Sequence, residues 1–324
     1  MIRTGFPDFG PTLGEVGERG VIDAIVAAAP SAINGDDAAV FTPAAPNSRV
    51  VASTDMLVAG RHFTPEYSTP FHVGQKAVVQ NFADIEAMGA RPLAALLAIS
   101  APPSMPVAVI EELARGVGSM TEAWSSELVG GDVTAGKDLV VSVTAIGSLG
   151  GNLEALRLDR ARPGQRVVAH GRLGYSAAGL ALLQHAAETG IPVPERFEPL
   201  VQAHQVPHIT PGRGVVARSA GATAMTDNSD GLIKDFSTMA RRSGVGIELS
   251  AVALSPDKIL VDAARYLNAD PWQWVLCGGE DHTLIGTCDR SAPVGFRSIG
   301  TVTRQEGVRI DGKEPAYTGG WESF

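Results

Sequence analysis

The stretch STDMLVAGRHF, residues 53–63, places two hydroxyl residues and an acid directly after the apolar run from Arg49 to Ala52. We expect this run to be a strand and Ser53-Thr54-Asp55 to be the turn at its end. Further acidic motifs are spread along the chain, most of them beside glycines at the ends of apolar segments: GDD at 35–37, Asp84, GGD at 130–132, DNSDG at 227–231 and GGED at 278–281. Carboxylates that converge from such turns repel one another unless divalent cations lie between them. The pattern predicts a hard-metal site that binds phosphates.

The composition restricts the partners that the chain can have. Its 324 residues predict two domains of about 150 residues each. Lys and Arg total 26 against 35 Asp and Glu, and no basic run occurs, so we expect no nucleic-acid partner. The longest apolar stretch, near residues 93–99, is too short to cross a membrane, and residues 1–10 lack the apolar segment of a signal peptide. Two cysteines are too few for a disulfide framework, so a cytoplasmic location is predicted.

Hydrophobic periodicity predicts mixed strands and helices in two halves. Helices are expected at 13–29, 72–88, 107–124, 176–187, 231–240 and 256–266, with Ser229 or Asp230 capping the fifth. Strands are expected at 93–100, 139–149, 166–169, 222–225, 246–249, 283–287 and 295–302. The glycine-rich segment 147–164 is the predicted boundary between domains 1–150 and 151–324. The fold class is α/β or α+β.

Two glycine-rich segments need a separate interpretation. GDVTAGK, residues 131–137, fits the first part of a P-loop, but Asp138 follows where Ser or Thr is required, and the next segment is typical of a strand. A P-loop is therefore not expected, and magnesium has to supply most of the positive charge at any phosphate site. Residues 174–179 fit either a phosphate-binding helix N-terminus or an ordinary capped helix.

Taken in order, these segments resemble the thiamine-monophosphate kinase family, of the superfamily that includes aminoimidazole ribonucleotide synthetase and selenophosphate synthetase. The matching stretches are residues 34–40, 53–63, 76–92, 130–132, 174–183, 227–232 and 278–281, so the resemblance covers nearly the whole chain. The two specific ones are STD…HF at 53–63 and DIEAMGARP at 84–92.

The resemblance implies an enzyme that transfers the γ-phosphoryl group of ATP to thiamine monophosphate and produces thiamine diphosphate. It implies direct in-line attack assisted by several Mg²⁺ ions. The acceptor is an ionised phosphate oxygen, so positioning and charge neutralisation suffice for catalysis. The implied fold is a two-domain, aminoimidazole ribonucleotide synthetase-like α/β plus α+β fold. Its N-terminal domain binds ATP and magnesium and forms a barrel across a homodimer interface.

The resemblance also assigns roles to individual residues. The implied magnesium ligands are Asp37, Ser53, Thr54, Asp55, Asp84, Asp132, Asp227 and Asp230, of which Asp55, Asp132 and Asp230 are the catalytic candidates. The nucleotide is expected to contact Gly131, Asp132, Ser229 and Arg157, although Arg160 is an equal alternative to Arg157 because the family's arginine position holds Leu158. The implied substrate contacts are His62, Glu280 and Trp321.

The sequence departs from the family pattern at other positions. Ala83 precedes Asp84 where a Ser is usual, Val133 follows GGD where Thr is common, and His282 stands where Tyr is usual. None of these changes removes a predicted metal carboxylate, so an active enzyme is expected. The alternatives are another ATP-dependent synthetase of the superfamily and a catalytically idle protein that binds thiamine phosphates or nucleotides and regulates another process.

Overall fold

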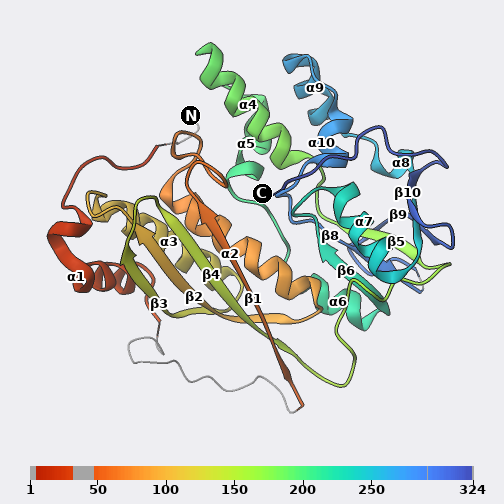
Figure 1. Cartoon of the computed structure of the whole chain (residues 1–324), viewed down its shortest axis with the longest axis horizontal. Coiled ribbons are helices and arrows are strands. Elements are labelled where there is room, and N and C mark those ends of the chain that lie inside the picture. The colour runs from red at the N-terminus through yellow and green to blue at the C-terminus, as the bar shows by residue number, and fades with distance from the viewer. Residues whose placement is uncertain (1–4, 32–46, 290, 323–324) are drawn as a thin grey trace. The chain divides into compact units, whose positions relative to one another are not determined.

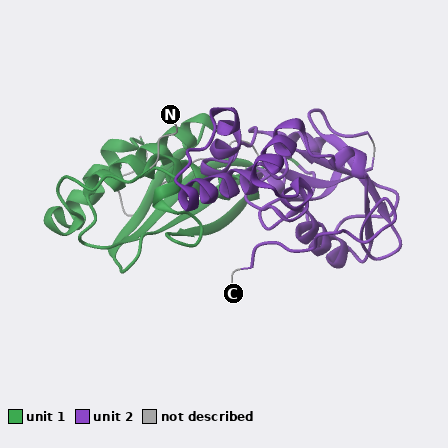
Figure 2. Cartoon of the chain, turned by 90° about the horizontal axis from the view of Figure 1, so that it is seen from above, with its two compact units in different colours: residues 1–85, 91–151 green, residues 86–90, 152–324 purple. Residues whose placement is uncertain are grey.

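The computed structural model describes residues 5–31, 47–289 and 291–322. The chain divides into two compact units, coloured green and purple in Figure 2. Unit 1 comprises Met1–Ile85 and Arg91–Gly151, and unit 2 comprises Glu86–Ala90 and Asn152–Phe324. Among the described helices, none combines the length and the apolar composition needed to cross a membrane.

Unit 1 is built on a four-stranded sheet with the strand order β1-β4-β2-β3 (Figure 1). Its strands are β1 (Arg49–Val58), β2 (Arg91–Ala101), β3 (Glu127–Ala135) and β4 (Val140–Leu149). β4 pairs antiparallel with both β1 and β2, whereas β2 and β3 are parallel. Alternate residues of β4 are buried, as expected of a strand with one covered face. β1 and β3 therefore form the two edges of this sheet.

The helices of unit 1 are α1 (Leu13–Ala28), α2 (Pro70–Ala87), whose last two residues belong to unit 2, and α3 (Val107–Ala123), with a short 3₁₀ turn η1 (Pro65–Tyr67) before α2. α2 and α3 approach closely at two glycines. A Cβ atom on Gly74 would lie 2.1 Å from the carbonyl oxygen of Leu113, and one on Gly116 would lie 2.0 Å from that of Phe71. This close packing fixes α2, which carries Asn81 and Asp84, against the rest of unit 1.

Unit 2 contains a mixed six-stranded sheet with the order β10-β7-β9-β5-β8-β6. The strands are β5 (Arg166–His170), β6 (Ala222–Asp227), β7 (Gly246–Leu249), β8 (Leu284–Cys288), β9 (Arg297–Thr303) and β10 (Gly307–Ile310). All neighbouring pairs are antiparallel except β10 with β7. A core that includes Leu156, Val168, Met225, Leu284 and Phe296 lies beside this sheet. The sheet brings the ends of β6 and β8 together, which positions two of the acidic motifs.

The remaining elements of unit 2 are helical. They are α4 (Tyr175–Thr189), η2 (Glu195–Phe197), α5 (Glu198–Gln205), α6 (Arg213–Ser219), α7 (Leu232–Ser243), α8 (Ala251–Leu254), α9 (Lys258–Leu267) and α10 (Pro271–Cys277). The predicted helices and strands that overlap these elements and those of unit 1 are confirmed. α5, α6, α8, α10, β3 and β10 were not predicted, because they are short or contain glycine, proline or polar residues that favour turns.

The structure corrects two predicted turns. Ser53-Thr54-Asp55 is not a turn, because β1 continues to Val58 and pairs with β4 along its full length. Gly130-Gly131-Asp132 likewise lies inside β3. Glycine is required at position 131 because β2 lies close by: a Cβ atom there would lie 1.8 Å from the carbonyl oxygen of Leu97 in β2. No helix follows this segment, in agreement with the rejection of a P-loop.

The predicted cap of α7 is also wrong. Gly231 occupies the N-cap position, and neither Ser229 nor Asp230 caps the helix with its side chain. Instead, Asp235 in the first turn accepts hydrogen bonds from the backbone nitrogens of Asp230 and Gly231, at 3.3 and 3.1 Å. A carboxylate of the helix thus accepts from the backbone nitrogens just before its first residue. The side chains of Ser229 and Asp230 are therefore available for other contacts.

Candidate functional site

In unit 1, two side chains of helix α2 form hydrogen bonds with predicted site residues in strand β1. The Oγ of Ser53 donates a hydrogen bond to Asp84 Oδ2 at 2.5 Å, and the backbone nitrogen of Asp55 donates to Asn81 Oδ1 at 2.9 Å. Asn81 is buried, and its Nδ2 donates to the carbonyl of Ala77 at 2.8 Å, which fixes the amide. The structure therefore brings Ser53, Asp55 and Asp84 together. Asn81 was missed as a positioning residue, although a buried amide in an apolar helix was a signal for it.

His62 is fixed in the turn after β1. The backbone nitrogen of Val58 donates to His62 Nδ1 at 3.1 Å, so the neutral ring carries its proton on Nε2. Lys76 of α2 is buried, and its ammonium donates to the backbone carbonyl of His62 at 3.4 Å. The predicted substrate contact is thus held from both its ring and its backbone.

Asp132 lies at the opposite edge of the sheet from Asp55. The register places Asp132 in a row with Ala98, Ser142 and Met56, whereas Asp55 belongs to the neighbouring row. Neighbouring rows project from opposite faces, and three strand spacings of about 4.8 Å separate the edges. Within one copy of unit 1, Asp132 therefore does not lie beside Asp55, and its role as a magnesium ligand stays a prediction.

Thr54 projects from the same face as Asp132, away from Ser53 and Asp55. Its Oγ1 donates to the carbonyl of Val143 at 3.1 Å and accepts from Thr144 Oγ1 at 3.0 Å. Both contacts lie in the pairing of β1 with β4. Thr54 is thus engaged within the sheet and is not directed toward Asp84.

In unit 2, the end of β6 with the loop after it and the loop before β8 carry the second group. Asp227 and His282 are both buried, and Asp227 Oδ2 lies 2.7 Å from His282 Nδ1. The backbone nitrogen of His282 donates to the carbonyl of Asn228 at 3.2 Å, and that of Glu280 donates to the carbonyl of Ser229 at 2.9 Å. These bonds join the DNSDG and GGED motifs, which are about fifty residues apart in sequence, into one structural element.

Three carboxylates crowd around the start of α7. Burial, followed by the charges of Asp227 and Asp230, raises the pKa of Asp235 to about 8. Lys234 places its ammonium 3.2 Å from Asp230 Oδ2. Asp235 and Lys234 were not predicted as site residues, because their roles depend on the loop conformation and not on a motif. A concentration of negative charge at this point favours a bound cation.

The N-terminus of α4 is occupied by Asp281. Its carboxylate accepts hydrogen bonds from the backbone nitrogens of Gly174 at 2.5 Å and Ser176 at 2.8 Å. Burial raises the pKa of Asp281 to about 7, against the opposing effect of the two backbone donors. Of the two interpretations of residues 174–179, the structure supports the capped helix, with a carboxylate of the chain itself in the anion position.

Glu280 adopts an unusual backbone conformation, with φ of 62°, which non-glycine residues rarely adopt. Its Oε2 lies 3.7 Å from His204 Nδ1, and the Oγ of Ser176 lies 3.3 Å from the same nitrogen. His204 is buried, whereas Glu280 is half-buried. A residue held in a strained backbone conformation next to a buried imidazole is typical of functional sites.

The other predicted nucleotide and substrate contacts lie in exposed segments. Trp321 is 40% exposed, and its backbone nitrogen donates to the carbonyl of Asp230 at 2.9 Å. Arg157 forms two hydrogen bonds with Asp159, at 2.9 and 3.0 Å. Arg160 lies 3.9 Å from Glu154. Both arginines carry a carboxylate partner, so the choice between them stays open.

The residues present fit magnesium in part. Asp227 and Asp230 supply hard oxygen donors, and the buried Oδ1 of Asn228 has no hydrogen-bond partner, which leaves an orphaned acceptor beside them. In the ranges that the structure describes, no three His, Cys, Asp or Glu side chains are grouped as a metal site. Asp37 lies outside the described residues.

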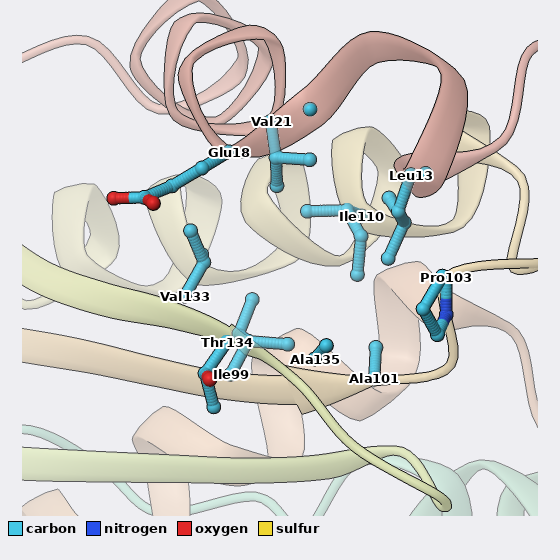
Figure 3. A pocket seen from close by; sticks show the side chains of 12 residues that line it. Leu13, Glu18, Val21, Ile99, Ala101, Pro103, Ile110, Val133, Thr134 and Ala135 are labelled. Carbon is cyan, nitrogen blue, oxygen red and sulfur yellow. The ribbon is translucent and has the colours of Figure 1, made fainter.

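A separate cavity of about 310 Å³ lies in unit 1 between α1, α3 and the strands β2 and β3 (Figure 3). Its wall is mostly apolar, with Val21, Ile99, Ile110 and Val133 among the lining residues, and Glu18 at its margin. None of the predicted site residues lines it. It is therefore distinct from the acidic groups described above.

Comparison with known proteins places this architecture in a family. Residues 35–149 match the model of the AIR synthase related protein, N-terminal domain. The chain is 59% identical to the thiamine-monophosphate kinase of Corynebacterium glutamicum, over 98% of this chain and 98% of that protein. The chain belongs to the thiamine-monophosphate kinase family. The family predicted from the sequence motifs is thus confirmed.

Solved structures agree with this assignment to the thiamine-monophosphate kinases. The structure of AaThiL complexed with AMPPCP and TMP matches with a TM-score of 0.76 and 32% identity, covering 98% of this chain and all of that one (100%). HypE of E. coli, a hydrogenase maturation protein, matches with a TM-score of 0.71 at 18% identity, which shows a shared fold alone. The predicted aminoimidazole ribonucleotide synthetase-like fold is confirmed.

Proposed function

We propose that this protein is a thiamine-monophosphate kinase that transfers the γ-phosphoryl group of ATP to thiamine monophosphate, giving thiamine diphosphate and ADP. The observation that carries the proposal is the full-length similarity to the Corynebacterium glutamicum kinase, at 59% identity. The complex of AaThiL with AMPPCP and TMP supports ATP as the phosphoryl donor. A kinase of this kind acts in the biosynthesis of thiamine diphosphate.

Several Mg²⁺ ions would serve as the cofactor. When bound, magnesium neutralises the charge on the two phosphate groups and aligns them for in-line transfer. In unit 2, Asp227 and Asp230 would hold magnesium, with Asn228 Oδ1 as a further oxygen ligand. Magnesium commonly takes one or two carboxylates and completes its coordination with water and substrate phosphates, so a small acidic group suffices.

In unit 1, the pair Ser53 and Asp84, together with Asp55, whose backbone nitrogen bonds Asn81 of the same helix, would hold magnesium as well. We assign Asp132 and Thr54 as further ligands on the family resemblance, and Asp37 on the same basis, although it lies outside the described residues. The catalytic candidates remain Asp55, Asp132 and Asp230. Their role is to bind metal charge and not to act as a base.

The nucleotide and substrate contacts follow the same resemblance. Gly131, Asp132 and Ser229, together with Arg157 or Arg160, would contact ATP. His62, Glu280 and Trp321 would contact thiamine monophosphate. The fixed geometry of His62 and Glu280 supports this assignment, because both side chains are held by neighbouring groups before any substrate binds.

We also propose a homodimer in which the unit 1 sheets of two copies form a barrel. Both edges of the sheet, β1 and β3, lack a neighbouring strand within the described residues of the chain. Val50 and Met56, on the face opposite to Ser53 and Asp55, are 72% and 55% exposed. A second copy would cover these apolar side chains. Met56→Lys is expected to convert the dimer into monomers in equilibrium sedimentation, and an unchanged mass would refute this interface.

Both cysteines are free thiols, which supports a reducing, cytoplasmic location. The alternatives to the kinase are another ATP-dependent synthetase of the superfamily and a non-catalytic regulator. The test is a single-turnover incubation with magnesium, ATP and thiamine monophosphate, followed by chromatography of the thiamine phosphates. Formation of thiamine diphosphate supports the kinase. ATP consumption only with a different acceptor supports a synthetase, and binding of the ligands without ATP consumption supports a regulator.

A further inference from the structure

Lys234 connects a predicted metal ligand to a predicted substrate contact. Its ammonium lies 3.2 Å from Asp230 Oδ2 and also donates a hydrogen bond to the backbone carbonyl of Trp321. The backbone nitrogen of Trp321 donates in turn to the carbonyl of Asp230 at 2.9 Å. Asp230, Lys234 and Trp321 thus form a closed set of three contacts in unit 2.

The segment that carries Trp321 is pressed closely against the start of α7. A Cβ atom on Gly320 would lie 2.6 Å from the carbonyl oxygen of Asp230 and 2.9 Å from the Cδ of Lys234. Only glycine allows this approach. Residues 319–322 have no helix or strand of their own, so these contacts hold the segment in place.

The charge distribution makes Lys234 a competitor of the metal. Asp230 lies beside a second carboxylate, because its backbone nitrogen donates a hydrogen bond to Asp235 Oδ2 at 3.3 Å. The Lys234 ammonium offsets part of this negative charge at Asp230 Oδ2. A divalent cation on the same carboxylate would meet the repulsion of the nearby ammonium.

We propose that Lys234 is a positioning residue that links metal occupancy of Asp230 to the placement of Trp321. This inference rests on the proposed function. The ammonium weakens metal binding at Asp230 and, through the carbonyl of Trp321, holds the C-terminal segment for the thiamine substrate. Removal of the ammonium is expected to strengthen metal binding, because the metal loses a competitor for Asp230. It is expected to weaken substrate binding, because the segment that carries Trp321 is no longer anchored.

The test compares Lys234→Met with Lys258→Met as a matched control. Lys258 pairs with Asp262 on the exposed side of α9, so its replacement removes the same charge and an ion pair of the same spacing elsewhere in unit 2. Binding of Mn²⁺ without nucleotide is followed by the paramagnetic resonance signal of the free ion. Hydrogen exchange of residues 319–322 is measured in the metal-free protein, and kcat and KM are measured with thiamine monophosphate.

Lys234→Met is expected to bind Mn²⁺ about three-fold more tightly, because a partly exposed positive charge beside Asp230 is lost. Hydrogen exchange at 319–322 is expected to accelerate about ten-fold, and KM for thiamine monophosphate to rise about five-fold, with kcat changed less than about two-fold. Lys234→Arg is expected to restore KM, and Lys258→Met to resemble the wild type in every measurement.

Unchanged or weaker Mn²⁺ binding in Lys234→Met would overturn the inference, and so would unchanged exchange at 319–322. A wild-type protein that binds no Mn²⁺ at millimolar concentration would also overturn it. A wild-type protein that forms no thiamine diphosphate refutes the proposed function instead. The two failures are therefore distinguishable in the same set of assays.

Discussion

Replacement of Asp281 by Asn is expected to change how the stability of the protein depends on pH. Burial raises the pKa of Asp281 from its ordinary value of 3.8 to about 7. The folded state therefore binds this proton more tightly than the unfolded state does. The stability of the wild type falls as pH rises between these two values, and the full penalty is present above pH 7. Below about pH 4 the penalty is absent, because both states are protonated.

The size of the effect follows from this shift. Each pKa unit corresponds to about 1.4 kcal/mol, so the wild type loses about 3 kcal/mol between pH 5 and pH 8 through this group. Asn does not titrate and keeps one acceptor for the two donors of Gly174 and Ser176. Asp281→Asn is therefore expected to be about 1–2 kcal/mol less stable than the wild type at pH 5, and at least as stable at pH 8.

Urea unfolding followed by circular dichroism at pH 5, 6, 7 and 8 measures this difference. Other titrating groups cancel when the variant is compared with the wild type at each pH. Asp270→Asn is the control, because Asp270 caps α10 through the backbone nitrogen of Trp272 but is exposed. Its curve is expected to run parallel to that of the wild type. A constant difference between Asp281→Asn and the wild type from pH 5 to pH 8 would refute the reasoning.

Three further predictions concern the site. Asp55→Asn and Asp132→Asn are each expected to lower kcat at least ~10²-fold through lost metal charge, and near-normal rates in both would contradict the metal assignment. Gly131→Ala is expected to destabilise unit 1 by about 2–4 kcal/mol, because the new Cβ would lie 1.8 Å from the carbonyl of Leu97; an unchanged thermal midpoint would exclude this packing argument. Chelation with EDTA is expected to abolish the formation of thiamine diphosphate and excess Mg²⁺ to restore it, whereas full activity after chelation would exclude a metal-assisted reaction.

Local sequence signals were sufficient for the long elements of the fold. The apolar spacing of residues 72–88 predicted α2 because a helix with a buried face repeats its apolar positions, and the alternation of 139–149 predicted β4 for the equivalent reason. The signals failed at Ser53-Thr54-Asp55, where residue types that favour turns lie inside β1. Pairing with β4 along the whole strand outweighs the local preference there.

In the candidate site, too, local motifs could be predicted, whereas roles that depend on the folded conformation could not. The motif residues Asp227 and Asp230 were predicted as site residues because acids near glycine at the end of an apolar segment are locally recognisable. Asp235 and Lys234 gain their roles from the conformation of that loop, and no spacing rule marks them. The position of Asp132 relative to Asp55 could not be read from the motifs, because strand order decides which edge a motif occupies, and strand order depends on long-range pairing.

The bond between Asp281 and the start of α4 has a consequence for synthesis of the protein on the ribosome. Gly174 precedes its carboxylate partner by 107 residues. At typical translation speeds of about 5–20 residues per second, the nascent helix waits several seconds or longer before this partner leaves the exit tunnel. Until then its first amides have only water as acceptors. Folding of unit 2 is therefore completed late, after nearly all of its chain has emerged. A truncated polypeptide that stops before this aspartate is expected to have an incompletely docked helix α4.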